Sequence, residues 1–180
     1  MGKRVLVILT SLRAGSNSDR LGEAFAKGAE EAGNQVETVS LKGKQLRFCL
    51  GCLSCIKTQK CVIRDDDAPE IVAKMKEADV IAFATPVYYY GMSGQMKVLL
   101  DRANPLYTAD YAFRDIYLLA TAAEDEDEAV DGTRNGVECW IACFEKARLA
   151  GTVFAGGVDG PGTVEGHPAV LKAYETGKAV

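Results

Sequence analysis

The sequence predicts an α/β fold built on a parallel β-sheet, and two features of the chain support this. Apolar runs of strand length alternate with segments whose apolar residues recur at helical spacing. The first run, RVLVILT at residues 4–10, is almost continuously apolar and β-branched, as expected of a strand buried on both faces. A length of 180 residues corresponds to one domain, residues 1–180, at about 150 residues per domain.

Five strands are expected, and four of them follow the opening run. Their predicted ranges are 4–10, 35–41, 79–84, 116–121 and 152–155. Parallel neighbours need a crossover between them, which the helical segments provide with right-handed connections.

Helices are expected at 20–32, 68–78, 91–103, 135–149 and 167–178. The first places Leu21 and Phe25 on one face and stops at Gly33. In the fourth helix, Cys139 and Cys143 stand at i and i+4, a spacing typical of core positions. The pair Asp101 and Arg102 predicts an exposed ion pair at a helix end.

Composition restricts the function classes. The chain has 21 basic and 25 acidic residues, so a nucleic-acid partner is not expected. A single histidine excludes a three-histidine zinc site, and we expect His167 to lie at the surface or cap a helix. No apolar run approaches 18 residues, and the first is too short for a signal peptide, so we expect no membrane segment and a cytoplasmic protein.

Ligands of open α/β sheets bind beyond the carboxyl ends of the strands, where two loops are informative. The loop after the first strand carries polar side chains before a helix start, which favours an anion such as phosphate. These side chains are Ser11, Arg13, Ser16, Asn17 and Ser18. The alternative is a solvated turn capped by Asn17 or Ser18.

The loop after the third strand, TPVYYYGM at residues 85–92, places three tyrosines beside the same edge. Tyrosine rings suit stacking on a planar ligand, and Gly91 allows the turn into the next helix. The alternative is that the tyrosines only cover the sheet end. The small loop that begins at Thr121 lets a flat ligand approach.

Four of the six cysteines, Cys49, Cys52, Cys55 and Cys61, fall within one loop of about twenty residues. Three interpretations are open: ligands of a [4Fe–4S] cluster, ligands of zinc, or free thiols near the ligand site. The run differs from that of ferredoxins, which has a shorter last gap and a following proline. The loop is also a candidate contact for a partner subunit.

These motifs resemble the NADPH-dependent FMN reductase group of the flavodoxin-like fold. SLRAGSNS at 11–18 is similar to its phosphate loop, and TPVYYYGMSGQMK at 85–97 to its isoalloxazine loop. The cysteine segment with Asp65–Asp67 resembles that of iron–sulfur flavoproteins. Thr10 and Leu12 depart from the glycine and proline usual in the phosphate loop.

The resemblance implies a three-layer sandwich, a five-stranded parallel sheet of order 2-1-3-4-5, and bound FMN. The phosphate would lie at Ser11, Arg13, Ser16, Asn17 and Ser18, and the ring at Pro86, Val87, Tyr88 and Tyr89. Gly91 and Thr121 are also expected to contact FMN. The family is often dimeric, so a homodimer or higher homo-oligomer is expected. No side chain is expected to act as a catalytic acid or base, because the cofactor carries the chemistry.

Three functions follow from these patterns. The first is an FMN-dependent NAD(P)H oxidoreductase that passes electrons to a quinone, a flavin or a similar small acceptor. The second is an iron–sulfur flavoprotein that carries electrons between FMN and a cluster on the four loop cysteines. The third is a flavodoxin-fold module that has lost FMN and binds a protein partner.

Overall fold

The computed structural model describes residues 2–180 and has a parallel sheet at its centre. Its parallel strands are β1 (Arg4–Leu9), β2 (Gln35–Ser40), β3 (Val80–Tyr88), β5 (Asp115–Thr121) and β6 (Arg148–Ala155). They lie in the order β2-β1-β3-β5-β6, which confirms the expected order 2-1-3-4-5 of the parallel strands. One short strand was not expected: β4 (Gly91–Met92) turns back and pairs antiparallel with the end of β3.

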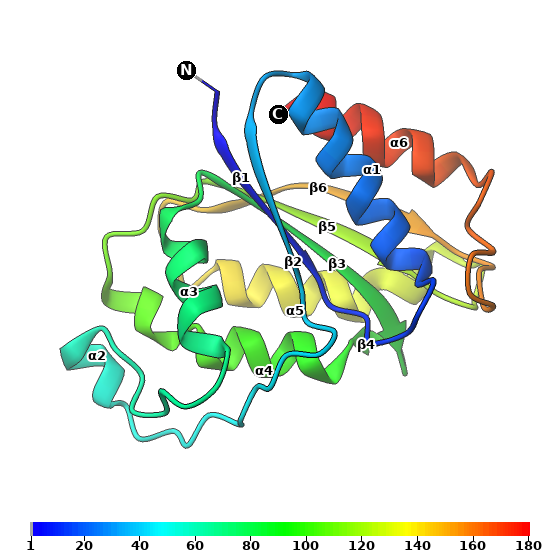
Figure 1. Cartoon of the computed structure of the whole chain (residues 1–180). Helices are drawn as coiled ribbons and strands as arrows, with labels where there is room; N and C mark the ends of the chain where they lie inside the picture. Colours follow the sequence, from blue (N-terminus) through cyan, green and yellow to red (C-terminus); the bar gives the residue numbers. More distant parts are fainter. Residues whose placement is uncertain (1) are drawn as a thin grey trace.

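Helices cover both faces of the sheet (Figure 1). On one face lie α1 (Asn17–Glu31) and α6 (Pro168–Lys178), and on the other lie α3 (Ala68–Glu77), α4 (Gly94–Arg102) and α5 (Asp131–Ile141). In β1, Val5 and Val7 pack into the core under α1 and α6, whereas Leu6 and Ile8 pack into the core on the other face. Burial on both faces explains why the sequence of β1 is continuously apolar.

The α1–α6 contact depends on two glycines. A Cβ atom at Gly28 would lie 2.1 Å from the carbonyl oxygen of Tyr174, and one at Gly177 would lie 2.0 Å from that of Phe25. Both distances are far below van der Waals contact. The backbones of the two helices therefore approach each other where neither carries a side chain.

Several predicted boundaries are wrong. The helix expected at 135–149 begins earlier and ends at Ile141, because residues 148–151 pair with β5 as the start of β6. Cys139, within α5, and Cys143, beyond its end, are both exposed and do not lie in the core as expected. The helix expected from Gly91 begins at Gly94, where the Ser93 side chain accepts a hydrogen bond from the Met96 N–H.

The first helix also begins earlier than expected, at Asn17. The Ser16 side chain caps it by accepting a hydrogen bond from the backbone N–H of Asp19. The extra residues place Asn17 and Ser18 in the first helical turn, whereas Ser11 and Arg13 stay in the loop before it. His167 caps α6 in the expected way, since its Nδ1 accepts from the Ala169 N–H at 3.1 Å.

The cysteine segment contains one short helix, α2 (Ser54–Thr58), which packs against the 3₁₀ helix η1 (Asn104–Thr108). The Gln59 Nε2 donates to the Thr108 carbonyl at 2.8 Å, and the Thr108 hydroxyl donates to the Ile56 carbonyl at 3.0 Å. In Figure 1 this unit lies at the end of the molecule opposite the carboxyl ends of the strands. A second 3₁₀ helix, η2 (Asp127–Val130), precedes α5.

Arg102, at the end of α4, closes the base of the cysteine loop. Its side chain is fully buried, and it forms an ion pair with the equally buried Asp66. The guanidinium also donates to the carbonyl of Arg47 at 2.8 Å and to that of Ile63 at 3.1 Å. These carbonyls stand on either side of the four cysteines, so one side chain holds both ends of the loop.

The expected pair of Asp101 with Arg102 is therefore wrong, since Asp101 pairs instead with Lys97 on the exposed face of α4. Burial raises the pKa of Asp66, but hydrogen bonds from Arg102 and from the Arg47 N–H outweigh it and hold that pKa below its ordinary value. Asp66 is thus charged and paired at neutral pH.

The aspartates beside Asp66 strengthen the same closure. Asp65 accepts two hydrogen bonds from the Arg47 guanidinium, at 2.8 and 2.9 Å. Asp67 accepts from Lys44 at 2.9 Å and from the Gln45 N–H at 2.7 Å. Three consecutive aspartates therefore bind the segment that leads into the cysteines.

We predict that Arg102→Met lowers the free energy of unfolding by about 3–5 kcal/mol, because it leaves Asp66 buried without its partner. The double variant Arg102→Met/Asp66→Asn should recover part of this loss. The measurement is urea unfolding monitored by circular dichroism.

The control is Arg134→Ala, which removes an exposed ion pair with Asp131 and should cost about 0–1 kcal/mol. A loss at Arg102 no larger than that at Arg134 would contradict this role.

Candidate functional site

A pocket of about 160 Å³ lies at the carboxyl ends of β1, β3 and β5. Eight of the eleven residues predicted for FMN line it: Ser11, Arg13, Ser16, Asn17, Pro86, Val87, Tyr88 and Thr121. They come from three strands that adjoin in the sheet and from the start of α1. Ser18, Tyr89 and Gly91 do not line this pocket.

The start of α1 gives the pocket an anion-binding wall. The first N–H groups of a helix have no intrahelical partner, and the helix dipole makes this end positive. Ser16 caps the helix, and its hydroxyl lies 3.0 Å from that of the buried Ser18. Ser18 therefore holds the capping hydroxyl of Ser16 in place through a hydrogen bond. Ser11 is buried in the same wall and accepts from the Arg13 N–H at 3.2 Å.

The loop after β6, which no sequence pattern predicted as part of the site, forms another wall of the pocket. The Asn17 amide donates to the carbonyl of Gly160 at 2.8 Å and accepts from the Val164 N–H at 3.2 Å. Arg13 donates to the Asp159 carbonyl at 2.7 Å. The amide of Asn17 is thus engaged within the chain, which leaves its backbone N–H to face a ligand. The glycines around residues 156–162 are the only sequence signal for this loop.

The two residues that depart from the usual phosphate loop lie outside the pocket. Thr10 is fully buried, and its hydroxyl donates to the Ala84 carbonyl at 3.0 Å and lies 3.1 Å from the Ser93 hydroxyl. Leu12 is 53% exposed and points to a different hollow. Neither side chain occupies the space that a phosphate would need.

The tyrosines form a two-residue hairpin between β3 and β4. Tyr88 pairs with Gly91, and the central residues Tyr89 and Tyr90 have φ angles of 50° and 60°. Positive φ at both positions matches a type I′ turn, which usually takes Asn-Gly. Only Tyr88 reaches the pocket, whereas Tyr89 is fully exposed at the tip.

Asp19 is the one strongly perturbed carboxyl beside this pocket. It stands in the first turn of α1, and its buried Oδ1 has no hydrogen-bond partner among residues 2–180. Burial raises its pKa from 3.8 to about 6, although a hydrogen bond with Ser16 lowers it in part. Asp19 therefore carries a full negative charge only above about pH 7.

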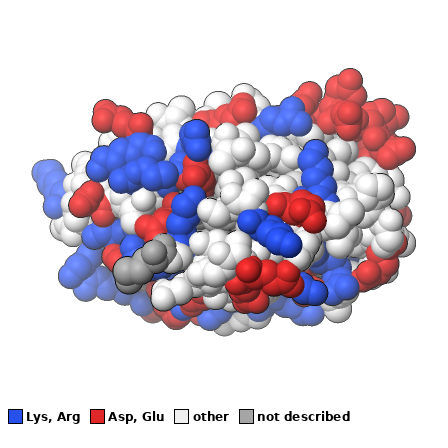
Figure 2. All heavy atoms as spheres, turned by 90° about the horizontal axis from the view of Figure 1, so that it is seen from above, with Lys and Arg blue, Asp and Glu red and all other residues white. Residues whose placement is uncertain are grey.

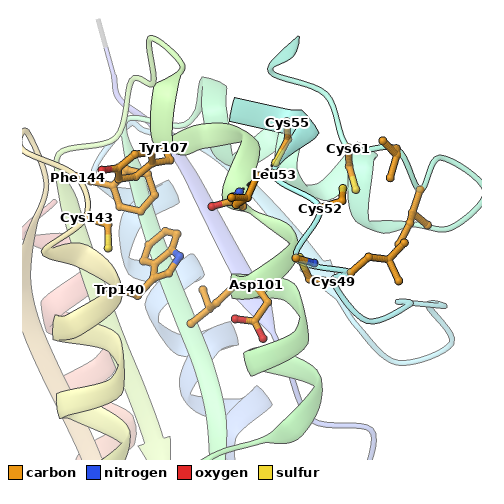
Figure 3. A pocket seen from close by; sticks show the side chains of 16 residues that line it. Cys49, Cys52, Leu53, Cys55, Cys61, Asp101, Tyr107, Trp140, Cys143 and Phe144 are labelled. Atoms are coloured by element: carbon orange, nitrogen blue, oxygen red, sulfur yellow. Dashed lines mark hydrogen bonds between the residues drawn. The ribbon is translucent and has the colours of Figure 1, made fainter. Parts of the chain in front are cut away.

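The four loop cysteines line a second pocket, of about 430 Å³. Figure 3 shows Cys49, Cys52 and Cys61 along one side of it, with Cys143 and Trp140 of the α5 region across from them. Cys55 is buried, and its sulfur accepts from the Asn104 amide at 3.0 Å. The loop thus brings its four thiols to one hollow.

Within residues 2–180, no three Cys, His, Asp or Glu side chains are close enough to hold a single metal ion. A mononuclear zinc site is therefore not formed in this conformation. In an iron–sulfur cluster the thiolates bind different irons around a larger core, so they stand further apart than around one ion. The chemistry of the four thiols around one hollow fits that larger group.

The two pockets share no lining residue, and α4 runs between them. Near its start, Gln95 donates to the Thr10 carbonyl, and near its end Leu100 and Asp101 line the cysteine pocket. Nine residues at 1.5 Å rise make this helix about 14 Å long. The loop thiols are consequently not neighbours of the predicted flavin site in the same chain.

Charged side chains are unevenly distributed over the molecule. Figure 2 shows acidic groups gathered at the end where the strands finish, and many basic groups at the opposite end. The acidic run at residues 124–128 is exposed throughout. No helix among residues 2–180 has the length and apolar character required to cross a lipid bilayer.

Comparison with known proteins identifies relatives. Residues 3–135 match the family model described as NADPH-dependent FMN reductase. An iron–sulfur flavoprotein of Methanocaldococcus jannaschii is 42% identical over 103 residues, which are 57% of this chain and 53% of that protein. One from Methanosarcina thermophila is 33% identical over 133 residues, covering 74% of this chain and 65% of the relative. The matches thus span about half to two thirds of these relatives.

Solved structures share the fold. The NAD(P)H:quinone oxidoreductase of Methanothermobacter marburgensis superposes with a TM-score of 0.73 at 19% identity, covering 99% of this chain and 96% of the other. An azoreductase of Bacillus anthracis also gives 0.73, at 17% identity, covering 99% and 100%. These similarities establish a flavodoxin-like architecture.

We predict that Asp19→Asn stabilises the protein at pH 7 by roughly 1–3 kcal/mol and has little effect at pH 4. The folded pKa of about 6 exceeds the unfolded value of 3.8, so the native state binds more protons between these values. Its stability therefore falls as the pH rises through this window, and the variant lacks that fall. Urea unfolding at pH 4 and pH 7 measures the difference.

Asp110→Asn is the control, because the Asp110 side chain is 94% exposed. It should change stability by less than about 0.5 kcal/mol at either pH. An Asp19→Asn effect that is equal at both pH values would disprove the assignment.

Proposed function

Because the chain belongs to the NADPH-dependent FMN reductase family, we propose that it is an FMN-dependent NAD(P)H oxidoreductase. The observation that carries the proposal is the pocket at the carboxyl ends of β1, β3 and β5. It combines a helix start suited to an anion with a wall suited to a flat ring. FMN has both parts, a phosphate and an isoalloxazine ring.

In this proposal the phosphate lies at the start of α1. The free backbone N–H groups of Asn17 and Ser18 and the hydroxyls of Ser11 and Ser16 donate to its oxygens. Arg13 adds a charged hydrogen bond, and its contact with the Asp159 carbonyl already holds it beside the pocket. No carboxylate other than Asp159 lines this pocket.

The ring would lie between Tyr88 and the segment from Thr121 to Ala123, with Pro86 and Val87 at its edge. Ala122 and Ala123 are small enough for a flat ligand to approach the backbone. When bound, FMN accepts hydride from a reduced nicotinamide and passes on electrons, so the protein needs only to orient it. The lone histidine has no part here, since it caps α6.

The electron acceptor is proposed to be a small molecule such as a quinone or a flavin. The ring wall carries exposed tyrosine, with Tyr88 51% exposed, so a planar acceptor has access to it. Small aromatic acceptors stack on such surfaces.

We also propose that residues 1–180 act as one domain that forms a homodimer or higher homo-oligomer in the cytoplasm. Phe48, Leu50 and Leu53 are 76%, 68% and 63% exposed, and such apolar clusters are typical of contact surfaces. All six cysteines are free thiols, which suits a reducing compartment.

We predict that the protein binds FMN and that Arg13→Ala weakens this binding about 10- to 100-fold, because it removes a charged hydrogen bond worth about 1.5–3 kcal/mol. Quenching of FMN fluorescence by the apoprotein measures the affinity. Arg134→Ala, an arginine outside the pocket, should bind FMN as the parent protein does.

A protein that takes up no FMN would overturn the flavin proposal and favour a binding module without cofactor. An unchanged affinity of Arg13→Ala would overturn the placement of the phosphate. Activity is assayed as NADH and NADPH oxidation with a quinone or free flavin.

A second candidate function is electron transfer by an iron–sulfur flavoprotein. It is favoured by the four cysteines around one pocket, and the relatives from M. jannaschii and M. thermophila carry that name. In this proposal Cys49, Cys52, Cys55 and Cys61 hold a [4Fe–4S] cluster. The hydrogen bond from Asn104 to the Cys55 sulfur would then stabilise a thiolate.

We predict that protein purified without oxygen contains iron and acid-labile sulfide in equal amounts and that Cys52→Ser loses most of both. Cys139→Ser, an exposed cysteine outside the loop, should retain them. Iron and sulfide analysis with the absorption near 400 nm gives the result. A parent protein with flavin bands and no iron would refute the cluster and leave the first function standing.

A further inference from the structure

A third pocket, of about 470 Å³, lies on the other side of the cysteine loop. It is bounded by the end of α2, by α3 and by η1. Its lining residues are Thr58, Gln59, Lys60, Cys61, Arg64, Pro69, Val72, Ala73, Lys76, Arg102, Pro105, Leu106 and Ala109. It shares only Cys61 with the cysteine pocket and no residue with the flavin pocket.

Every charged side chain that lines this pocket is basic. Lys60, Arg64 and Lys76 have no carboxylate within 4 Å among residues 2–180, whereas six of the other eight arginines and five of the other ten lysines are paired. The chain as a whole has a net charge of −4, so this local excess of cations is opposite to the overall charge. Three unpaired cations around one hollow attract an anion.

Arg102 forms part of the wall of this pocket. Its side chain is fully buried and paired with Asp66. Because its terminal nitrogens hold Asp66 and two carbonyls, the guanidinium is fixed in position.

The remaining lining is largely apolar. Pro69 and Val72 come from α3, and Pro105 and Leu106 from η1. Apolar walls with a few convergent polar groups are typical of sites for small organic molecules, and the volume is in their range. An inorganic ion would leave these walls without a contact.

We propose that this pocket binds a small organic anion, with its acidic group toward Lys60, Arg64 and Lys76 and its aromatic or aliphatic body against the proline and leucine side chains. The site is separate from the flavin pocket, with which it shares no lining residue, and it adjoins the cysteine pocket through Cys61. Its occupant contacts residues 58–64, the segment that carries Cys61.

The probe is 8-anilinonaphthalene-1-sulfonate, an anion with an apolar body, titrated by calorimetry into protein saturated with FMN. Its uncharged analogue N-phenyl-1-naphthylamine has the same body without the sulfonate. We expect one site for the anion and at least roughly tenfold weaker binding of the analogue, which corresponds to about 1.4 kcal/mol.

Two variants locate the site. Arg64→Glu/Lys76→Glu should weaken binding of the sulfonate by roughly tenfold or more, whereas Lys27→Glu/Lys172→Glu, at exposed positions elsewhere, should change it less than about twofold. Ala73→Trp, which fills the pocket from an exposed position on α3, should abolish binding without altering charge.

Equal binding of the uncharged analogue, or unchanged sulfonate binding in the Arg64/Lys76 or Ala73 variant, would overturn the proposal. FMN content is measured in the same samples and should be unaffected by these variants. If the protein binds no FMN, the titration is repeated without it, so failure of the flavin proposal and failure of this one are distinguished.

Discussion

The ion pair between Arg102 and Asp66 holds the part of the chain that has the fewest other means of staying folded. Residues 41–67 contain one short helix, and half of their apolar side chains are exposed. Such a segment has little buried area to offset its conformational entropy. Arg102 bonds the chain on both sides of the cysteines, so the loop is closed at its base although its tip is exposed. Arg102 is buried, so it needs the carboxylate of Asp66 beside it, because an unpaired buried charge would be strongly destabilising.

The position of Arg102 also links regions that have different chemistry. It is the last residue of α4, whose first turn is bonded to the end of β1 through Gln95. The rigid helix fixes the distance between the flavin pocket and the cysteine loop. The same guanidinium forms a wall of the basic pocket, so this loop, its thiols and that pocket depend on one side chain.

The sheet was predictable because its signal is local. Four of the parallel strands are short, largely apolar runs, and β2 shows an alternating pattern. The order of the strands in the sheet follows from the family resemblance of the loops. The errors occur where pairing is decided by distant residues. Residues 148–151 continue a helical pattern in sequence, yet they form β6 because β5 offers a free edge, with Arg148 bonded to Asp115 at 2.7 Å. The i, i+4 spacing of Cys139 and Cys143 predicts core positions, but Cys139 lies on the exposed face of α5 and Cys143 beyond its end.

For the candidate site, the sequence identified residues whose chemistry suits a ligand. It missed residues whose role depends on contacts with distant parts of the chain. Hydroxyl side chains before a helix and tyrosines after a strand indicate a ligand site by their residue type and position alone. Arg102 looked like an ordinary exposed arginine, because its partner lies 36 residues away. The loop at 158–164 contacts Asn17, which is more than 140 residues away in the sequence. No pattern within either segment predicts that contact.

The hairpin at Tyr89 and Tyr90 illustrates how distant contacts enforce a local conformation that the sequence disfavours. Two tyrosines with positive φ are costly, of order 1–3 kcal/mol each, where Asn-Gly would turn more easily. The turn persists because its base is fixed. The hydroxyls of Thr10, Thr85 and Ser93 are buried together and join β1, β3 and the start of α4. Thr10, which departs from the usual glycine, therefore supplies a contact that glycine cannot make. This hydroxyl group secures the hairpin, and the hairpin in turn places Tyr88 at the pocket.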